Sequence, residues 1–469
     1  MNKQLQEDLS SLEKIIQLVG RQGLDYLQQL DQRYTSANKE APQEGSLPEK
    51  GMGAIEALQQ FNNRWEPLMV AASGPRYWGF VTGGTTPAAI AGDWLTTIYD
   101  QNTQAIKGYG DISAAIELET VRLLQELLEL PEDFLGGFVT GATMSNFTCL
   151  AVARQWLGQQ QGTDIAKDGV KAPLPVLTAT PHSSSVKSLA LLGFGSSHIT
   201  TIKTKEGNRE AMDMADLEAK ILQLNGQPFI LIASAGTVNT VDFDDFTAIA
   251  ALKKKHAFWW HIDAAFGGFA ILSDVYRHLL KGWEQADSIT VDCHKWLNVP
   301  YENAVFLIKR MHRLLQVSTF QNSNAPYLGD PLEQFNYLNL LPENSRRLKA
   351  LPAWFTLNAY GREGYRSIIE NSIRQALSFG AFIEACPQLQ LLAPVRLNIV
   401  CFSLAGATED PEKVAAFLSA LNKTGDVFMT PTQYKGQAGI RAAFVNFRTT
   451  AKDIERVKAY ILQLLAAGI

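Results

Sequence analysis

The chain has 469 residues, of which 46% are hydrophobic and 19% are charged, with a formal net charge of −5 and a pI near 5.9. This composition is typical of a globular protein with ample material for a core, and the slightly acidic balance gives no electrostatic reason to bind nucleic acid or an anionic membrane. The four cysteines show no metal-binding spacing and no apolar run is long enough to cross a bilayer, so we expect a cytoplasmic protein with reduced thiols and no membrane partner.

The first element expected is an amphipathic helix within residues 1–34. Leu5, Leu9 and Leu12, followed by Ile16, recur at helical spacing. An apolar stripe this far from the main body has to be buried, either on the chain's own body or on a second copy. The polar residues that follow predict a linker, so we assign residues 1–80 to an N-terminal helical arm and linker.

Residues 81–350 are expected to form a large α/β domain. From Phe138 to Lys309 short apolar strands alternate with helical segments, as in the strand, helix, strand unit over residues 229–263. This alternation predicts a mainly parallel sheet covered by helices. Ligands of such sheets bind at the carboxyl ends of the strands, so we expect the functional site there.

Residues 351–469 are expected to form a small α+β domain. A long helical region over residues 345–385 leads into it, and the segments 395–406 and 438–448 read as antiparallel strands. Thr450 and Asp453 resemble a capping box at the start of a last helix.

Lys295 and Asp263 are the most informative pair of residues in the sequence. The apolar run 289–291 leads to a lysine flanked by His294 and Trp296, and Asp263 ends an earlier apolar strand. Pyridoxal phosphate needs an amine that holds its aldehyde as an imine, and an anion that keeps its ring nitrogen protonated. The pair therefore predicts pyridoxal phosphate as the cofactor. Either residue alone is equally well explained as a solvated lysine or as an aspartate that caps the next segment.

Two further features fit the same cofactor. An apolar strand turns at Gly141 into a helix, and the first-turn N–H groups at Ala142 and Thr143 offer an anion site for the cofactor phosphate. An ordinary strand-to-helix turn has the same pattern. His182 follows an apolar run and precedes a helical stretch, where its ring could stack on the cofactor or simply belong to the helix start.

Taken in order, the motifs TGATMSN, TPHSSSVKS, ASAGTVNTVDFDD, HIDAAFGG and DCHKWLNVPYE resemble the group II pyridoxal-phosphate-dependent amino acid decarboxylases. The resemblance runs from about Pro75 to the C-terminus. It implies the fold of aspartate aminotransferase (fold type I), a homodimer whose N-terminal arm wraps the partner subunit, and decarboxylation of an L-amino acid to an amine and carbon dioxide.

The resemblance also implies roles for the residues around the cofactor ring. Lys295 matches the lysine that binds the cofactor, and Asp263 matches the partner of the ring nitrogen. His182 matches the ring-stacking histidine, and Ala265 the residue that packs on the opposite ring face.

The remaining matches concern the phosphate and the proton. Ala142, Thr143 and His294 match phosphate-contacting positions, and Thr237 matches a threonine beside the cofactor. Tyr327 matches the tyrosine of a mobile loop that is thought to return a proton to the α-carbon. Its presence favours simple decarboxylation over oxidation to an aldehyde, although a tyrosine in a polar loop needs no function.

Two groups of residues leave questions open. Asp292 and Cys293 stand where several relatives have asparagine and proline, and because an acid facing the phosphate would repel it, we expect Asp292 to face elsewhere. Arg76 and the aromatic residues over 77–80 lie where the resembled family builds the substrate mouth. A surface arginine and core aromatics are the alternative, so the sequence does not select one amino acid substrate.

Two rival functions share the lysine and the aspartate. An aminotransferase or carbon–carbon lyase of the same fold usually lacks the His-Lys-Trp context and the loop tyrosine. A protein that only binds pyridoxal phosphate would hold the cofactor without releasing a product.

Overall fold

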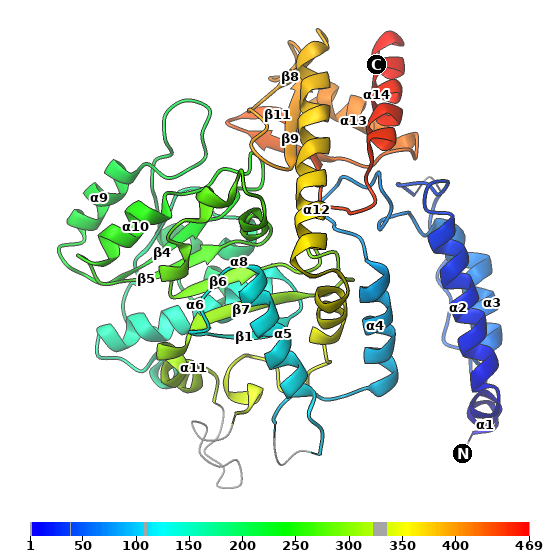
Figure 1. The fold of residues 1–469 in the computed structure, drawn as a ribbon, viewed down its shortest axis with the longest axis horizontal. Helices are drawn as coiled ribbons and strands as arrows, with labels where there is room; N and C mark the ends of the chain where they lie inside the picture. Colours follow the sequence, from blue (N-terminus) through cyan, green and yellow to red (C-terminus); the bar gives the residue numbers. More distant parts are fainter. Residues whose placement is uncertain (1, 38, 107–109, 322–334, 469) are drawn as a thin grey trace.

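A computed structural model describes residues 2–37, 39–106, 110–321 and 335–468 (Figure 1). Its centre is a mixed sheet that, within these ranges, has seven strands in the order β1-β7-β6-β5-β4-β2-β3. The strands β2 to β6 run parallel to their neighbours, and β7 lies antiparallel to both β6 and β1. The mainly parallel sheet is therefore confirmed. The strands are β1 (Phe134–Val139), β2 (Val176–Thr178), β3 (Ile199–Thr201), β4 (Phe229–Ser234), β5 (Phe258–Asp263), β6 (Ser288–Val291) and β7 (Ala304–Lys309).

Both faces of this sheet are buried. Successive residues of a strand point to opposite faces, so Leu231 and Ala233 of β4 join one hydrophobic cluster while Ile230 and Ile232 join another. This two-sided burial is why the central strands are apolar along their length rather than alternating.

Helices cover the two faces. One layer packs beside Leu231 and consists of α4 (Pro87–Tyr99), α5 (Ser113–Leu127), α9 (Met214–Gln223), α10 (Phe246–Lys253) and α12 (Ala350–Ala385). The other layer packs beside Ile230 and consists of α6 (Ala142–Gln160), α7 (Ile165–Asp168), α8 (Ser183–Leu191) and α11 (Arg313–Phe320).

A buried ion pair joins α5 to the chain that leads into α12. Nη2 of Arg346 lies 2.6 Å from Oε1 of Glu117, and the two side chains are 1% and 0% exposed. Arg346 also donates to the carbonyls of Thr103 and Phe138, and the Phe138 N–H donates to Glu117. Its guanidinium lies over the ring of Tyr337. Burial is the largest single effect on Arg346 and opposes its charge, but Glu117, Tyr337 and Glu343 together outweigh burial and raise the pKa of the guanidinium.

The C-terminal region forms a smaller antiparallel sheet with the order β10-β11-β9-β8 in the described chain. Both predicted strands of this region are present, and the Thr450–Asp453 capping box is confirmed, with the Thr450 hydroxyl and N–H both donating to the carboxylate. The elements are β8 (Leu389–Leu391), β9 (Ile399–Leu404), α13 (Pro411–Lys423), β10 (Thr430–Tyr434), β11 (Gln437–Ala443) and α14 (Ala451–Ala466).

The N-terminal arm lies beside α4 at one side of the molecule (Figure 1). It contains α1 (Lys3–Ser10) and α2 (Leu12–Gln28), which confirms the predicted helix, and also α3 (Ala54–Arg64), which we did not predict. The side-chain amides of Gln22 and Asn62 hydrogen-bond to each other and join α2 to α3.

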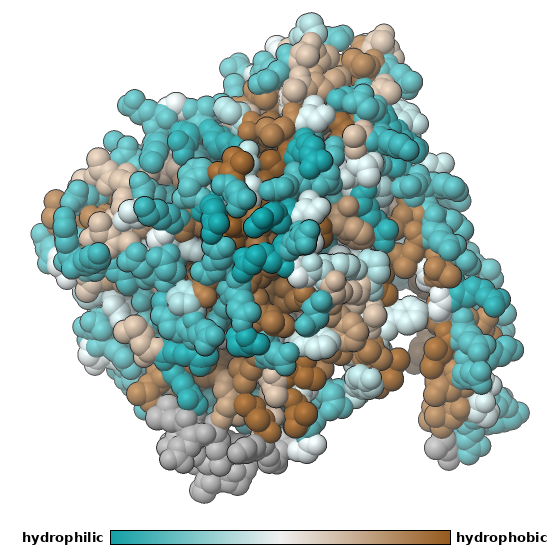
Figure 2. All heavy atoms as spheres, viewed as in Figure 1, coloured by the Kyte–Doolittle hydropathy of each residue, from teal (hydrophilic) through white to brown (hydrophobic). Residues whose placement is uncertain are grey.

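The apolar stripe of the arm is not covered by the rest of the chain. Its residues are between 45% and 57% exposed: Leu5, Leu9, Leu12, Ile16 and Val19. Figure 2 shows hydrophobic side chains along the edge of the arm that faces the body. No helix in the described ranges is both long and apolar enough to cross a membrane.

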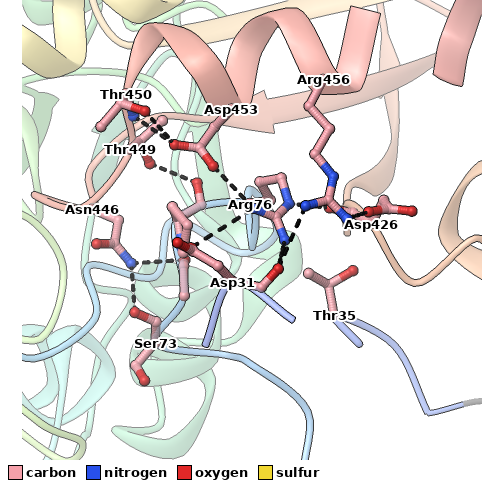
Figure 3. A network of polar contacts seen from close by, with 12 residues as sticks. Asp31, Thr35, Ser73, Arg76, Asp426, Asn446, Thr449, Thr450, Asp453 and Arg456 are labelled. Carbon is pink, nitrogen blue, oxygen red and sulfur yellow. Dashed lines mark hydrogen bonds and ion pairs between the residues drawn. The ribbon is translucent and has the colours of Figure 1, made fainter. Parts of the chain in front are cut away.

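Arg76 ties the arm to the small C-terminal sheet region (Figure 3). Its side chain is buried and donates to the carbonyls of Asp31 and Asp426, each at 2.8 Å, and to the carboxylate of Asp453 at 3.0 Å. Trp78 is buried against Phe379 and Phe444. Neither residue lines the candidate site described below. Trp78 is a core aromatic as the alternative had it, whereas Arg76 is a buried arginine and not a surface one.

Candidate active site

A cavity of about 440 Å³ lies at the carboxyl ends of the parallel strands. Five of the residues predicted for the site line it together: His182, Thr237, Asp263, Ala265 and Lys295. They come from the segments that follow β2, β4, β5 and β6. The strand order alone brings them together, because parallel neighbours end at the same edge.

The carboxylate of Asp263 is held by donors on both oxygens. Nδ2 of Asn146 donates to Oδ2 at 3.0 Å and the Ser185 hydroxyl donates at 3.3 Å, while the N–H of Ala265 donates to Oδ1 at 3.2 Å. Asn146 and Ser185 are buried, so these donors cannot turn to water. A carboxylate in a fixed orientation is the result.

His261 supports this arrangement from behind. Its Nε2 lies 3.0 Å from Oδ1 of Asn146, and its Nδ1 lies 2.9 Å from the Ser288 hydroxyl. Because Asn146 turns its NH₂ group toward Asp263, its oxygen has to accept, which places the proton of the neutral imidazole on Nε2. Burial lowers the pKa of His261 to about 4, so the ring is neutral at pH 7.

Lys295 lies beside an acid that we expected to point away. Its Nζ is 3.1 Å from Oδ2 of Asp292, and Nε2 of His294 is 3.2 Å from Oδ1 of the same carboxylate. Asp292 is not among the residues that line the cavity, so the expectation that it faces away from the phosphate stays a prediction. Burial opposes ionisation of Asp292, but Lys295 and His294 outweigh it and lower its pKa.

The predicted phosphate turn lies next to the same loop. Helix α6 begins at Ala142, and a Cβ atom added to Gly141 would lie 3.4 Å from Cε1 of His294. Thr143 is exposed at the first turn. The three predicted phosphate residues, Ala142, Thr143 and His294, thus come from two segments that meet at Gly141.

His182 caps α8 and faces the cavity. Its Nδ1 accepts the N–H of Ser184 at 3.2 Å, so the proton of the neutral ring sits on Nε2. The surrounding protein atoms lower the pKa of His182, although its ring remains reachable through the cavity mouth. The ring is neutral at pH 7.

The segment over residues 80–83 closes one side of the cavity. Phe80 and Val81 both line it and both adopt left-handed backbone conformations, with φ of 56° and 66°, which cost roughly 1–3 kcal/mol each in non-glycine residues. Gly83 packs directly on the lysine loop. A Cβ atom there would lie 1.6 Å from the carbonyl oxygen of Lys295, so only glycine fits.

The sequence interpretation missed two charged residues of the cavity, Glu210 and Arg441. Glu210 follows β3 in an irregular segment, and Arg441 lies on β11 of the small sheet. Neither belongs to a motif with recognisable spacing. Arg441 is 203 residues from Val238, the carbonyl to which it donates, so only the tertiary fold reveals its place.

Tyr327 lies outside the described residues, so its prediction stays open. Among the described residues no group of three or more His, Cys, Asp or Glu side chains could hold a metal ion.

The residues present fit pyridoxal phosphate. The cavity has the size of ordinary small-molecule sites, and its wall carries the amine of Lys295 and the fixed carboxylate of Asp263, the two groups that this cofactor requires. A helix N-terminus suited to a phosphate begins at Gly141, next to His294 of the lysine loop.

Comparisons with known proteins agree with this geometry. Residues 41–405 match the family model described as the pyridoxal-dependent decarboxylase conserved domain. The chain is 29% identical to an aromatic-L-amino-acid decarboxylase of Bacillus atrophaeus over 427 residues, which cover 89% of this chain and 87% of that relative. It is 27% identical to an L-2,4-diaminobutyrate decarboxylase of Rhizobium meliloti (strain 1021) over 421 residues, with 88% and 82% covered.

The crystal structure of Oryza sativa TDC with PLP and tryptamine has a TM-score of 0.88 to this chain at 22% identity, and the match covers 98% of both chains. The expected fold type I architecture is therefore confirmed.

Proposed function

The chain belongs to the pyridoxal-dependent decarboxylase family, and on this premise we propose that the cavity around Lys295 is the site at which an L-amino acid loses carbon dioxide. Pyridoxal-phosphate-dependent decarboxylation of an amino acid is the activity of the family, so the chain is a carboxy-lyase. The observation that carries the residue assignment is that Lys295 and Asp263 line one cavity at the carboxyl ends of the strands.

When bound, pyridoxal phosphate supplies a cationic ring that accepts the electron pair released as carbon dioxide leaves. We assign Lys295 to the cofactor aldehyde and Asp263 to the ring nitrogen. Asn146, Ser185 and the N–H of Ala265 hold the carboxylate of Asp263 in its orientation. This orientation is the protein's contribution to the electron sink.

The other predicted residues complete the cofactor site. The N–H groups of Ala142 and Thr143 would hold the phosphate together with His294. His182 would stack on the ring as a neutral imidazole, and Ala265 would leave room on the opposite face. Thr237 lies beside the cofactor and donates its hydroxyl to Glu210.

Arg441 provides the anchor for the substrate carboxylate. Its Nη1 donates to the carbonyl of Val238 at 3.4 Å, and its buried Nε has no hydrogen-bond partner in the described chain. A half-buried cation with an unused donor is a ready site for a carboxylate. Tyr327 would return a proton to the α-carbon, which gives an amine instead of an aldehyde.

The test is release of carbon dioxide from purified protein loaded with cofactor and offered each L-amino acid. Lys295→Ala should abolish both turnover and the visible absorbance of the lysine-bound cofactor. Lys187→Ala, at an exposed position on α8, should retain both. Formation of a keto acid without carbon dioxide would refute decarboxylation and favour an aminotransferase.

We further propose that the functional unit is a cytoplasmic homodimer. The exposed stripe of α1 and α2 supports a second copy as its cover, because five large apolar side chains in one row are unfavourable in water. All four cysteines are free and buried, as in proteins of reducing compartments. Burial raises the pKa of Cys149 to about 12, so its thiol stays protonated.

Sedimentation velocity tests the dimer. The wild type should sediment as a dimer, and Leu9→Glu together with Ile16→Glu should shift it to monomer without loss of helical content. A monomeric wild type would refute the proposal.

A further inference from the structure

The cavity contains two charged side chains that the cofactor does not use. Four charged residues among the described ones line it: Lys295, Asp263, Glu210 and Arg441. The proposed function, on which this inference rests, commits the first two to the cofactor. One anion, Glu210, and one cation, Arg441, therefore face the space left for a substrate.

Glu210 is fixed at both its backbone and its side chain. Its N–H donates to Oδ2 of the buried Asp242 at 2.8 Å. Its Oε2 accepts hydrogen bonds from the hydroxyls of Thr237 at 2.5 Å and Thr240 at 2.6 Å. Both threonines are buried, so the carboxylate cannot swing away from the cavity.

No cation of the described chain forms an ion pair with Glu210. The adjacent Arg209 is bound through two nitrogens to Asp242, at 2.7 Å each, and is not available. No described Lys, Arg or His forms an ion pair with Glu210, and no described donor reaches its Oε1. A carboxylate that lines a pocket with one free oxygen is a site for a positively charged or hydrogen-bond-donating group.

Glu210 and Arg441 are held apart by the same turn. Thr237 and Thr240 bind Glu210, while the carbonyl of Val238, between them, accepts from Arg441. No ion pair joins the two charges in the described structure, although they line one cavity. The cavity thus presents a negative and a positive group at fixed positions, which suits a ligand with both charges.

We propose that this decarboxylase selects amino acids with a cationic side chain, and that Glu210 is the residue that recognises the side-chain ammonium. Arg441 binds the α-carboxylate. The α-amine is consumed in binding to the cofactor, so the cation at Glu210 has to be a second one. The substrate loses its α-carboxylate as carbon dioxide and gains one proton at the α-carbon, which yields a diamine.

Other side chains fit this pair of charges less well. An acidic side chain would place a second carboxylate opposite Glu210, and an aliphatic one would remove water from Glu210 without replacing its hydrogen bonds. An aromatic side chain would stack near Phe80 and leave the same carboxylate without a counter-charge.

The experiment measures kcat/KM for carbon dioxide release from cofactor-loaded protein. The substrates are 2,4-diaminobutyrate, ornithine and lysine, with norvaline and norleucine as neutral analogues, and glutamate and tyrosine as other classes. The variant is Glu210→Gln, which keeps an acceptor for both threonines. Glu206→Gln, exposed in the same segment, is the matched control.

We expect one of the basic amino acids to be the best substrate. Glu210→Gln should lower its kcat/KM by about 10- to 100-fold, the value of one hydrogen bond to a charged group, and leave the neutral analogues within about twofold. Glu206→Gln should behave as wild type. Calorimetry should show that the diamine product binds wild type at least tenfold more tightly than Glu210→Gln, while a monoamine binds both equally.

The outcomes separate this inference from the proposed function. Carbon dioxide release that is fastest with tyrosine or a neutral amino acid, and unchanged in Glu210→Gln, would overturn the selectivity and leave the decarboxylase intact. Carbon dioxide release from none of the amino acids would overturn the decarboxylase itself, and the selectivity with it.

Discussion

Replacement of Glu117 by glutamine should destabilise the protein far more than replacement of Glu126, an exposed glutamate on the same helix. The pair with Arg346 is 2.6 Å long and fully buried, which gives an attraction of about 6 kcal/mol at an effective dielectric constant of about 20. Loss of one partner of such a pair costs about 3–5 kcal/mol, because the other charge stays buried. Glutamine still accepts the Phe138 N–H and Glu343 lies 3.8 Å from Arg346, so we expect about 3 kcal/mol.

Glu126→Gln on the same helix is the matched control. Glu126 pairs with Arg122, but the two side chains are 50% and 49% exposed, so its loss should cost about 0.5 kcal/mol or less. Urea unfolding of the wild type and both variants, followed by tryptophan fluorescence and far-UV circular dichroism, measures the two free energies. Equal losses in the two variants would show that burial of the Glu117–Arg346 pair does not set its energy.

Three other outcomes can be checked on the purified protein. Gly83→Ala should displace Lys295 and abolish the absorbance of the bound cofactor, because the added Cβ would meet the carbonyl oxygen of Lys295. Gly51→Ala, where no atom lies within 4 Å of the added Cβ, should keep the absorbance. A normal spectrum in Gly83→Ala would contradict the close approach of Gly83 to Lys295. Because the pKa of His261 is lowered to about 4, its contribution to the free energy of unfolding is complete above pH 6.5, and about 3 kcal/mol of it is lost as the pH falls to about 4. Urea unfolding at a series of pH values should show that the stability of His261→Asn falls less steeply with acid than that of the wild type. Identical slopes would count against the assignment. Asp292→Asn should lower the free energy of unfolding of the cofactor-free protein by about 3 kcal/mol at pH 7, because Lys295 and His294 lose the carboxylate beside them. Since the pKa of Asp292 is lowered, this difference from the wild type should disappear only below about pH 4. A difference that vanishes already at pH 6 would rule the ion pairs out.

Much of the fold could be predicted because its strands bury both faces. Continuous apolar runs between turn residues locate β4, β5 and β6, and parallel order then places Asp263 and Lys295 at one edge. Helix α3 was missed because its sequence is mostly polar and follows a linker. Ile55, Leu58 and Phe61 recur at helical spacing in this segment, so a periodic signal was present and was overlooked. The contact of Asn62 with Gln22 of α2 is visible only in the structure.

The charges of the site were less predictable than its position. Glu210 and Arg441 enter the cavity from segments that are far apart in sequence, and only contacts with the 237–240 turn bring them together. The sequence interpretation also did not reveal that the carboxylate of Asp292 lies beside Lys295 and His294 of its own loop. Arg76 could have been an anion site by position, but three oxygen acceptors of the chain already use its guanidinium.

The contacts of Arg76 also bear on the order in which the chain assembles as it is synthesised. Arg76 leaves the ribosome 377 residues before Asp453, whose carboxylate accepts a hydrogen bond from its guanidinium. Until the last helix emerges, the guanidinium lacks the carboxylate of Asp453 and stays hydrated on that side. The contact through Arg76 between the arm and the small sheet region is incomplete until then. A nascent chain halted after β9 would therefore keep its first eighty residues loose, and removal of the final helix should have the same effect on the mature protein.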